Sequence, residues 1–430
     1  MSRYLSTTVL QWLALSLLLG AIPVRAAEPL GLRQAVDEAL ASSPGLAAIE
    51  ARARALAAIP EQRGTLPDPR LTLNLLNVPL DSFSLTQEGM TQFQIGISQA
   101  LPFPGKLALQ EAVARELAKA AELDLGELRL ALARDVKMVW WNLFYLDRAL
   151  ETVASNQTLL CQFVEVAQSK YQVGKGLQQD VLLAQLELSK LLDHKLALEG
   201  MRRNEAIRLN TLLDRPAEGE VRLPQRVDEG VPTLRAKREL MERAKMLRPR
   251  LMARERLLEA ARLRVKLAEK DYYPDFRLGA AWGVRGGENP DGSDRTDFGS
   301  LLFSMNLPIY SDSRQDRALD QRNSERLREQ FALHELRLRV MEEIGRALSD
   351  YRRSSEQAVL FKSGIIPQAS QTVASMLAGY QVNKVDFLNL VRSQITLYNY
   401  ETQYWKALSE SRQALARLAA AVGEEDIYEK

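Results

Sequence analysis

The sequence predicts an α+β membrane protein with an internal duplication, in which short barrel strands are joined to very long helices. Three observations carry this prediction: landmarks that recur 205 to 209 residues later, stretches of about ten residues that alternate in polarity, and two helical stretches of about 65 residues, of which the first has no proline and the second has one. The composition agrees with a folded chain, because 46% of the 430 residues are hydrophobic and 26% are charged.

Four landmarks of the first half recur in the same order in the second half. Pro44 corresponds to Pro249, and three longer segments correspond as follows: 67–71 (PDPRL) to 274–278 (PDFRL), 98–103 to 304–309, and 171–188 to 380–397. The duplication divides the chain into a first structural repeat, residues 27–225, and a second repeat with a C-terminal tail, residues 226–430. The seam around residues 215–233 is rich in Pro, Gly and Glu.

Alternating polarity predicts four barrel strands, two in residues 69–101 and two in residues 275–308. Successive side chains of a strand point to opposite faces, so Leu71, Leu73 and Leu75 form an apolar face opposite Thr72 and Asn74. About ten residues are enough for a tilted strand to cross a bilayer. A soluble sandwich would show the same alternation, but the long loops at 78–90 and 285–297, the second strongly polar, favour a membrane barrel.

The helical stretches are far longer than those of ordinary domains. Residues 107–171 contain no proline and one glycine, and residues 313–380 are interrupted only at Gly345, at Gly364–Pro367 and at Gly379. At a rise of about 1.5 Å per residue, 65 residues span about 100 Å. Such rods must bury an apolar stripe on other rods, and Leu182, Leu186 and Leu192 supply one beyond Gly174.

Four strands cannot close a barrel on their own. A sheet edge in lipid leaves backbone N–H and C=O groups without partners, and about eight strands is the smallest closed barrel. If these strands lie in a membrane, the chain must therefore form an oligomer, and three copies would supply twelve strands.

Residues 1–26 resemble a secretory signal peptide, with Arg3, an apolar stretch at 10–20 and small residues at the cleavage point after Ala26. A membrane anchor is the alternative, but the apolar stretch is short for a span. Cleavage would remove two of the 57 basic residues, Arg3 and Arg25, and none of the 55 acidic ones, so the rest has no net charge. This balance gives no surplus of positive charge for binding nucleic acid.

The chain has a single cysteine, Cys161, which excludes a disulfide framework. We expect Cys161 to pack as a small residue, and we expect an exported chain without an N-terminal lipid.

Several motifs together resemble the TolC-like outer membrane efflux channels, the outer membrane factors, from Leu30 to about Gly423. They are LGLRQA at 30–35 with AL at 39–40 and SP at 43–44, YQVG at 171–174 with DVLLAQ at 180–185, the copy of this turn from Tyr380, and LNTLLDRP at 209–216. PDP at 67–69 and QALPFPGK at 99–106 look more like the heavy-metal branch, the CzcC-like and CusC-like channels.

The resemblance implies a homotrimer in the bacterial outer membrane. Four strands per chain would complete a 12-stranded β-barrel in contact with lipid, and the long helices would continue it as a tunnel through the periplasm. The seam and the termini would form a belt around the tunnel. The hairpin turns would meet a periplasmic adaptor (a membrane fusion protein) and an inner membrane pump of the RND type.

The resemblance also implies where the channel closes and docks. Asp180 and Tyr380 match family positions that hold the tip shut. The usual basic partner falls on Val385, one residue after Lys384, and the acidic ring of the narrow aperture falls on Asn389 and Arg392, with Asp386 nearby. Replacing acidic residues by Asn and Arg puts cation preference in question. The adaptor would dock on two turns: Val173, Gly174, Lys175 and Gly176, and Val382, Asn383, Lys384 and Val385. Plain turn chemistry also explains these glycines.

The leading interpretation is an exit duct of a tripartite efflux system, with metal cations as one candidate substrate. Two alternatives are a duct for type I protein secretion and a soluble periplasmic coiled-coil adaptor. Two hairpins, each preceded by a strand pair, argue against the adaptor. The sequence contains no nucleophile elbow, phosphate loop or zinc-ligand spacing, so we expect no enzyme activity, no metal site and no cofactor.

Overall fold

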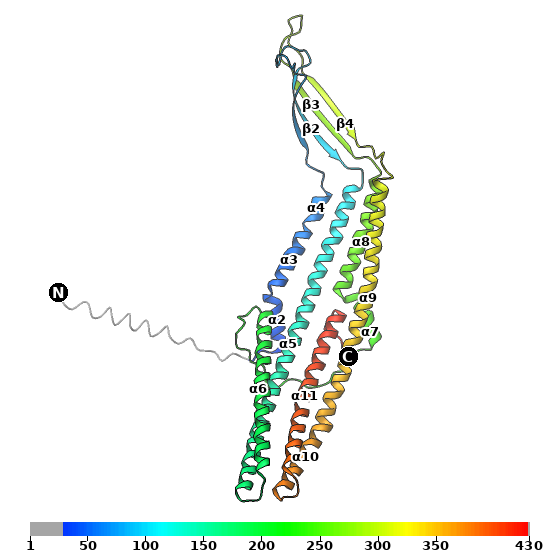
Figure 1. Cartoon of the computed structure of the whole chain (residues 1–430). Coiled ribbons are helices and arrows are strands. Elements are labelled where there is room, and N and C mark those ends of the chain that lie inside the picture. The colour runs from blue at the N-terminus through cyan, green and yellow to red at the C-terminus, as the bar shows by residue number, and fades with distance from the viewer. Residues whose placement is uncertain (1–28, 429–430) are drawn as a thin grey trace, which may run out of the picture.

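The computed structural model describes residues 29–428 and has the shape of a long rod (Figure 1). The predicted signal peptide lies outside the described residues. A bundle of long helices forms most of the length, and one sheet projects from one end of it. In chain order the elements are α2 (Leu32–Ser42), α3 (Pro44–Ala57), α4 (Ile59–Gly64), β1 (Arg70–Leu76), β2 (Gln92–Leu101), α5 (Lys106–Gln172), α6 (Gln178–Leu212), α7 (Lys237–Leu247), α8 (Pro249–Lys270), β3 (Phe276–Val284), β4 (Phe298–Met305), α9 (Gln315–Leu360), a π-helical turn (Phe361–Ile365), α10 (Ile366–Gln381) and α11 (Phe387–Val422).

The four predicted strands form one antiparallel sheet in the order β1-β2-β3-β4. Strand β2 of the first half pairs with β3 of the second half, so the two repeats share a continuous sheet. Paired residues lie on the same face. One row across all four strands consists of Leu71, Ile97, Ala280 and Leu301, and the neighbouring row on the opposite face consists of Thr72, Gly96, Ala281 and Ser300. The predicted apolar and polar faces are therefore aligned across the sheet.

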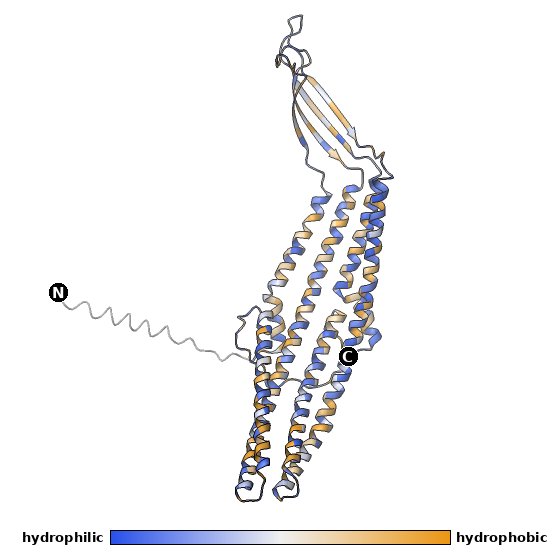
Figure 2. Ribbon diagram, viewed as in Figure 1, coloured by the Kyte–Doolittle hydropathy of each residue, from blue (hydrophilic) through white to orange (hydrophobic). Residues whose placement is uncertain are grey.

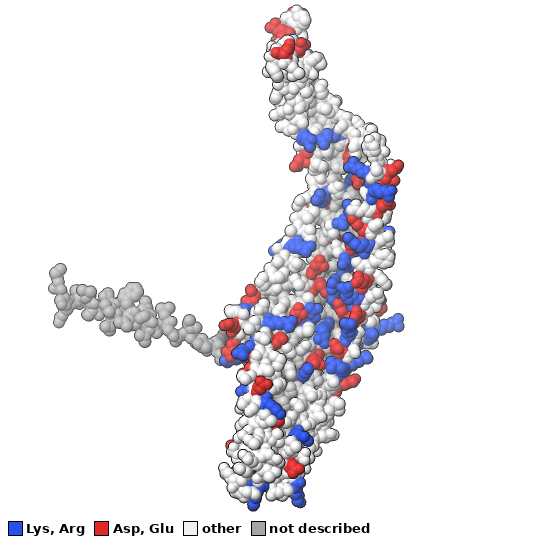
Figure 3. Space-filling model, in the orientation of Figure 1, with Lys and Arg blue, Asp and Glu red and all other residues white. Residues whose placement is uncertain are grey.

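The apolar face of this sheet is exposed within one chain. Leu71 is 66% exposed and Leu301 is 92% exposed, and no helix packs over them. Apolar residues run along the strands in Figure 2. In Figure 3, basic residues lie where the sheet meets the helices and acidic residues lie at the far end, with little charge between them. Such a surface is stable only where something other than water covers it.

The long helices follow the prediction with one difference. Helix α5 runs for 67 residues without a break, which at about 1.5 Å per residue is about 100 Å. In the second half the expected interruption at Gly364–Pro367 does not end the rod. Helix α9 continues into α10 through the π-turn Phe361–Ile365, because a wider turn accommodates the missing N–H and the ring of Pro367. No described helix contains a stretch apolar enough, over 18 residues, to serve as a membrane span.

The core consists of several apolar strips along the helices. At mid-length, Trp140, Trp141 and Phe144 of α5 pack against α2 and α6, and the Trp140 indole donates to the Leu30 carbonyl at 2.9 Å. Cys161 does not pack as predicted. It lies on a solvent-facing side of α5 and is exposed, because the apolar strip turns to other faces of the helix there.

Residues 213–236, here called the connecting segment, link the two repeats and meet both ends of the described chain. The Leu30 amide donates to the Arg222 carbonyl at 2.8 Å, and the Arg235 amide donates to the Ile427 carbonyl at 3.1 Å. A β-bridge joins Leu234 to Tyr428. The segment and the termini thus gather beside the middle of the helices, where the resemblance places the belt (Figure 1).

A buried lysine that pairs with two partly exposed carboxylates joins the sheet to the helices. Lys106, at the start of α5, is 6% exposed, and its Nζ lies 3.0 Å from carboxylate oxygens of both Asp271 and Asp275. Asp275 also accepts the Phe103 amide at 2.7 Å. Burial lowers the pKa of Lys106, but the hydrogen bonds and charges of the two carboxylates outweigh it and the pKa is raised.

We predict that Lys106→Met lowers the free energy of unfolding by about 1–3 kcal/mol, because the carboxylates of Asp271 and Asp275 then lie together without the cation that they share. Thermal unfolding of the detergent-solubilised protein measures the effect. Lys119→Met is the matched control: Lys119 is 45% exposed and pairs with Glu116 along one helix, so it should cost less than about 1 kcal/mol. Equal losses in the two variants would contradict a special role for Lys106.

Candidate functional site at the hairpin end

The two turns at the hairpin end have the same backbone structure. The Gly174 amide donates to the Tyr171 carbonyl at 3.0 Å and the Lys175 amide to the Lys170 carbonyl at 2.8 Å. In the second turn the Asn383 and Lys384 amides donate to the Tyr380 and Gly379 carbonyls at 3.2 and 2.8 Å. This is the Schellman pattern, in which a residue with positive φ ends the helix. Gly174 has a φ of 72° and Asn383 has a φ of 60°, as such a position requires.

In each turn, the end of the first helix closely approaches a residue just after the turn, and one of the two residues in contact must be a glycine. In the first turn the glycine follows the turn, and in the second turn it belongs to the helix. A Cβ on Gly176 would lie 2.9 Å from the Lys170 Cβ. The matching pair in the second repeat is Val385 and Gly379, and a Cβ on Gly379 would lie 2.5 Å from Val385 Cγ2. The first turn therefore has room for a lysine side chain where the second has a glycine.

That lysine joins the two hairpins within one chain. Lys170 Nζ donates to the Tyr380 carbonyl at 2.5 Å and to Asn383 Oδ1 at 2.7 Å, and it lies 4.0 Å from the centre of the Tyr380 ring. An ammonium over an aromatic face is attracted by the ring quadrupole. The end of α5 is thus bound to the end of α10 through three contacts of a single side chain.

Tyr380 is held in an apolar setting with its hydroxyl group unsatisfied. It is 5% exposed, its ring lies 5.2 Å from that of Phe387, and its hydroxyl has no hydrogen-bond partner among the described residues. Burial and the nearby charge of Asp180 raise the pKa of Tyr380. Among the described residues this hydroxyl is one of nine buried side-chain N or O atoms without a hydrogen-bond partner.

Asp180 is half-buried at the start of α6, close to the second turn. Burial and the charge of Asp386 raise its pKa, while the Leu177 backbone hydrogen bond and Lys170 act in the opposite direction. The predicted site residues Asp180 and Tyr380 therefore lie near one another, and both lie near Lys170. Lys384, Asp386, Asn389 and Arg392 are exposed on the second hairpin.

The residues predicted to dock an adaptor form the outermost surface of the two turns. Val173 is 67% exposed and Val382 is 62% exposed, while Gly174, Lys175, Asn383 and Lys384 are also exposed; Gly176 and Val385 are half-buried by the close approaches described above. Exposed valines on rigid turns are suited to contact with another protein.

Sequence reasoning assigned the basic partner of Tyr380 to Lys384 and missed Lys170. One signal was available: aligning the repeats places Lys170 over Gly379 and Gly176 over Val385. The two copies differ in side-chain size at both of these positions, and one of them, Lys170, forms the link between the hairpins.

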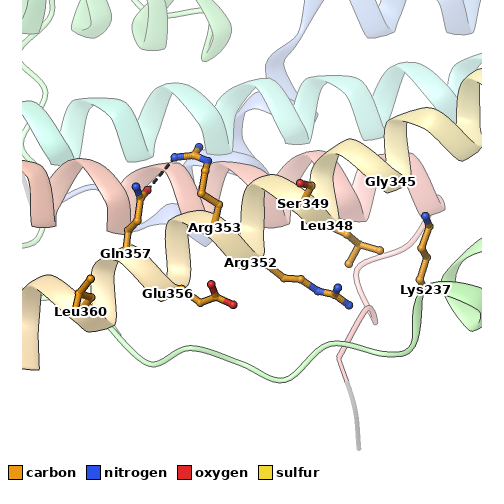
Figure 4. Close-up of a pocket in the computed structure, with 9 residues that line it drawn as sticks. All are labelled: Lys237, Gly345, Leu348, Ser349, Arg352, Arg353, Glu356, Gln357 and Leu360. Carbon is orange, nitrogen blue, oxygen red and sulfur yellow. Dashed lines mark hydrogen bonds between the residues drawn. The ribbon is translucent and has the colours of Figure 1, made fainter.

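The remaining concave surfaces are less suited to a site. The groove in Figure 4 runs along α9 and is lined by Lys237, Gly345, Leu348, Ser349, Arg352, Arg353, Glu356, Gln357 and Leu360. Arg353 hydrogen-bonds Gln357 along the same helix at 2.9 Å. Within residues 29–428 no group of three or more His, Cys, Asp or Glu side chains gathers as metal ligands.

We predict opposite effects for two Gly→Ala substitutions. Gly176→Ala should destabilise the first turn by about 1–3 kcal/mol, because its Cβ would overlap with Lys170. Gly200→Ala in the middle of α6 meets open space and should stabilise by about 0.5–1 kcal/mol through helix propensity. Unfolding midpoints compare the two, and a Gly176→Ala variant as stable as Gly200→Ala would contradict the close approach.

A sheet with an apolar outer face, joined to helical hairpins whose longest helix, α5, is about 100 Å long, defines a class of membrane channel whose strands line a barrel and whose helices extend it as a tube. Comparison with protein families agrees: the family described as "Outer membrane efflux protein" matches residues 35–215 and 240–424, one match in each half. The chain belongs to this outer membrane efflux protein family.

Solved structures show the same fold at low sequence identity. The outer membrane channel OprN has a TM-score of 0.78 and 20% identity, over 91% of this chain and 89% of that one. VceC from Vibrio cholerae has a TM-score of 0.77 and 18% identity, over 91% and 96%. CusC has a TM-score of 0.78 and 16% identity, over 91% and 92%. A comparison with curated proteins gave no match.

Proposed function

We propose that three copies of this chain form the exit duct of a tripartite efflux system, in contact with a periplasmic adaptor and an inner membrane pump of the RND type. The observation that carries this proposal is the sheet. Its apolar face is exposed, and among the described residues β1 and β4 each pair along one edge only. In lipid the apolar face is favourable and the free edges are not, so the edges must pair with those of other copies.

The helices support the same assembly. The leucines predicted to form a stripe on α6 are exposed within one chain, Leu182 by 57% and Leu186 by 52%, whereas Leu191 on another side of the helix is buried against α5 and α11. Leu192, Leu196 and Ile207 continue the exposed part along one side of α6. A long apolar stripe on a rod fits a second rod, and a neighbouring copy is the partner that the barrel already places beside it.

The hairpin end is the proposed gate. Lys170 holds the two hairpins of one chain together, and the half-buried Asp180 beside this link is available to a neighbouring copy. Opening requires the hairpins to separate, which breaks these contacts. The exposed turns beside them would dock the adaptor, so docking and opening would occur at one place.

We predict that Lys170→Met raises the conductance of the channel in planar lipid bilayers, because the hairpins lose their link. Asp180→Ala should act in the same direction. Tyr380→Phe should leave the conductance nearly unchanged, because the hydroxyl has no partner within its own chain and the ring that contacts Lys170 is kept. Lys175→Met is the matched control, because it removes the same charge from the exposed part of the same turn. Currents that are equal in all four variants and the wild type would contradict the gate.

For transport, we expect deletion of the gene to sensitise the bacterium to toxic metal cations, because 67–69 and 99–106 resemble the heavy-metal branch. Growth in graded metal and drug concentrations measures this, with the intact gene restoring resistance. Sensitivity to drugs alone would place the chain in the drug branch. Unchanged sensitivity together with loss of a secreted protein would favour type I secretion instead.

In this proposal the β-barrel alone, without an attached lipid, holds the protein in the outer membrane. Cleavage after Ala26 leaves no cysteine at the new N-terminus to receive a lipid. Sedimentation with outer membranes tests the location, and a product that stays in the periplasmic fraction would exclude the channel.

A further inference from the structure

The loop between β1 and β2 presents apolar side chains at the outer end of the molecule. Leu80 is 84% exposed, Phe83 is 70% exposed and Leu85 is 53% exposed. Phe83 also has a φ of 50°, which is uncommon for a bulky residue and fixes its position at a bend. These residues lie beyond the strands, so the lipid that would cover the apolar face of the sheet does not account for them.

Two arginines of the other loop hold this loop in place. Arg295 Nη1 donates to the Thr86 and Glu88 carbonyls, both at 3.0 Å, and to the Gly286 carbonyl at 3.2 Å. Arg285 Nη1 donates to the Gly89 carbonyl at 3.0 Å. The loop is therefore braced along residues 86–89, and the segment that bears the apolar side chains projects from this support.

Arg285, one of the two bracing arginines, lies on the polar face of the sheet. Val284 belongs to the apolar face, so Arg285 belongs to the opposite one, and its guanidinium lies 3.9 Å from the ring centre of Phe298, in the row of Asn74 and Gln94. On this face Gln92 is 8% exposed, whereas Phe93 beside it on the apolar face is 44% exposed. The loop thus approaches the side that becomes the lumen when three copies close the barrel.

We propose that Leu80, Phe83 and Leu85 of three copies meet near the barrel axis and form an apolar constriction at the outer mouth, a second gate distinct from the hairpin end. This inference rests on the trimer of the proposed function. The occupant of the apolar tip is then the same loop of the other two copies. Apolar side chains that line a narrow opening bury one another and expel water, which obstructs ions without charge or covalent chemistry.

Lipid is a poorer occupant for the tip. Arg285 of the brace is on the face away from lipid, and the adjoining loop contributes Glu288, Asp291 and Asp294 at the same end, whose charge repels phosphate-bearing headgroups. If the loops of three copies meet on the barrel axis, they cover one another's Leu80, Phe83 and Leu85, and no other partner is needed.

Cysteine cross-linking in outer membranes tests the proposal. In a Cys161→Ser background, Phe83→Cys treated with a short bis-maleimide should give covalent dimers on denaturing gels. Leu73→Cys is the matched control: it is exposed on the lipid face of β1, where three copies are spread around the barrel, and should stay monomeric. Trimers on native gels without Phe83→Cys cross-links would overturn the outer gate. Absence of native trimers would overturn the proposed function instead.

Conductance provides a second measurement that does not depend on cross-linking. Replacing Leu80, Phe83 and Leu85 together by Ser, in a channel opened at the hairpin end by Asp180→Ala, should raise single-channel conductance severalfold. Asp81→Ser in the same background is the control for altering the loop. Unchanged conductance of the triple variant would overturn the constriction, and native gels would verify that the variant still assembles.

Discussion

The fold depends on one constraint: a backbone hydrogen-bonding group has no alternative partner inside a bilayer. A sheet of four strands with an apolar face can satisfy its interior groups but not its two outer edges. The same feature that makes the sheet suitable for lipid makes the single chain incomplete. Strand β2 pairing with β3 extends the sheet across the two repeats, which halves the number of free edges that the duplication would otherwise create.

The helices carry the same incompleteness along the rest of the molecule. Each rod buries one strip of its surface on the rods of its own chain, and α6 leaves a second leucine strip uncovered. The sheet and the rods are joined where Lys106 pairs with Asp271 and Asp275, so the strands and the rods of one chain are arranged around a common axis. A tube is the result that satisfies both surfaces together.

The duplication explains the fold, and its imperfections explain the site. Both turns use the same Schellman hydrogen bonds, yet one presents Lys170 opposite Gly176 and the other presents Gly379 opposite Val385. The difference lets one hairpin reach into the other through an ammonium group that touches Tyr380. A glycine at position 170, as the second repeat has at 379, could not make this link.

The sequence alone determined the repeats, the strand faces and the length of the rods, because each depends on a local period or on the absence of proline. It also located both turns through YQVG and its copy. It did not predict the continuous path through Pro367, because a π-turn depends on how the neighbouring helices hold the backbone. Lys170 on Tyr380, the exposed Cys161 and the placement of Phe83 were decided by tertiary structure. Contacts between segments about 200 residues apart leave no periodic trace, so only the folded backbone brings such residues together.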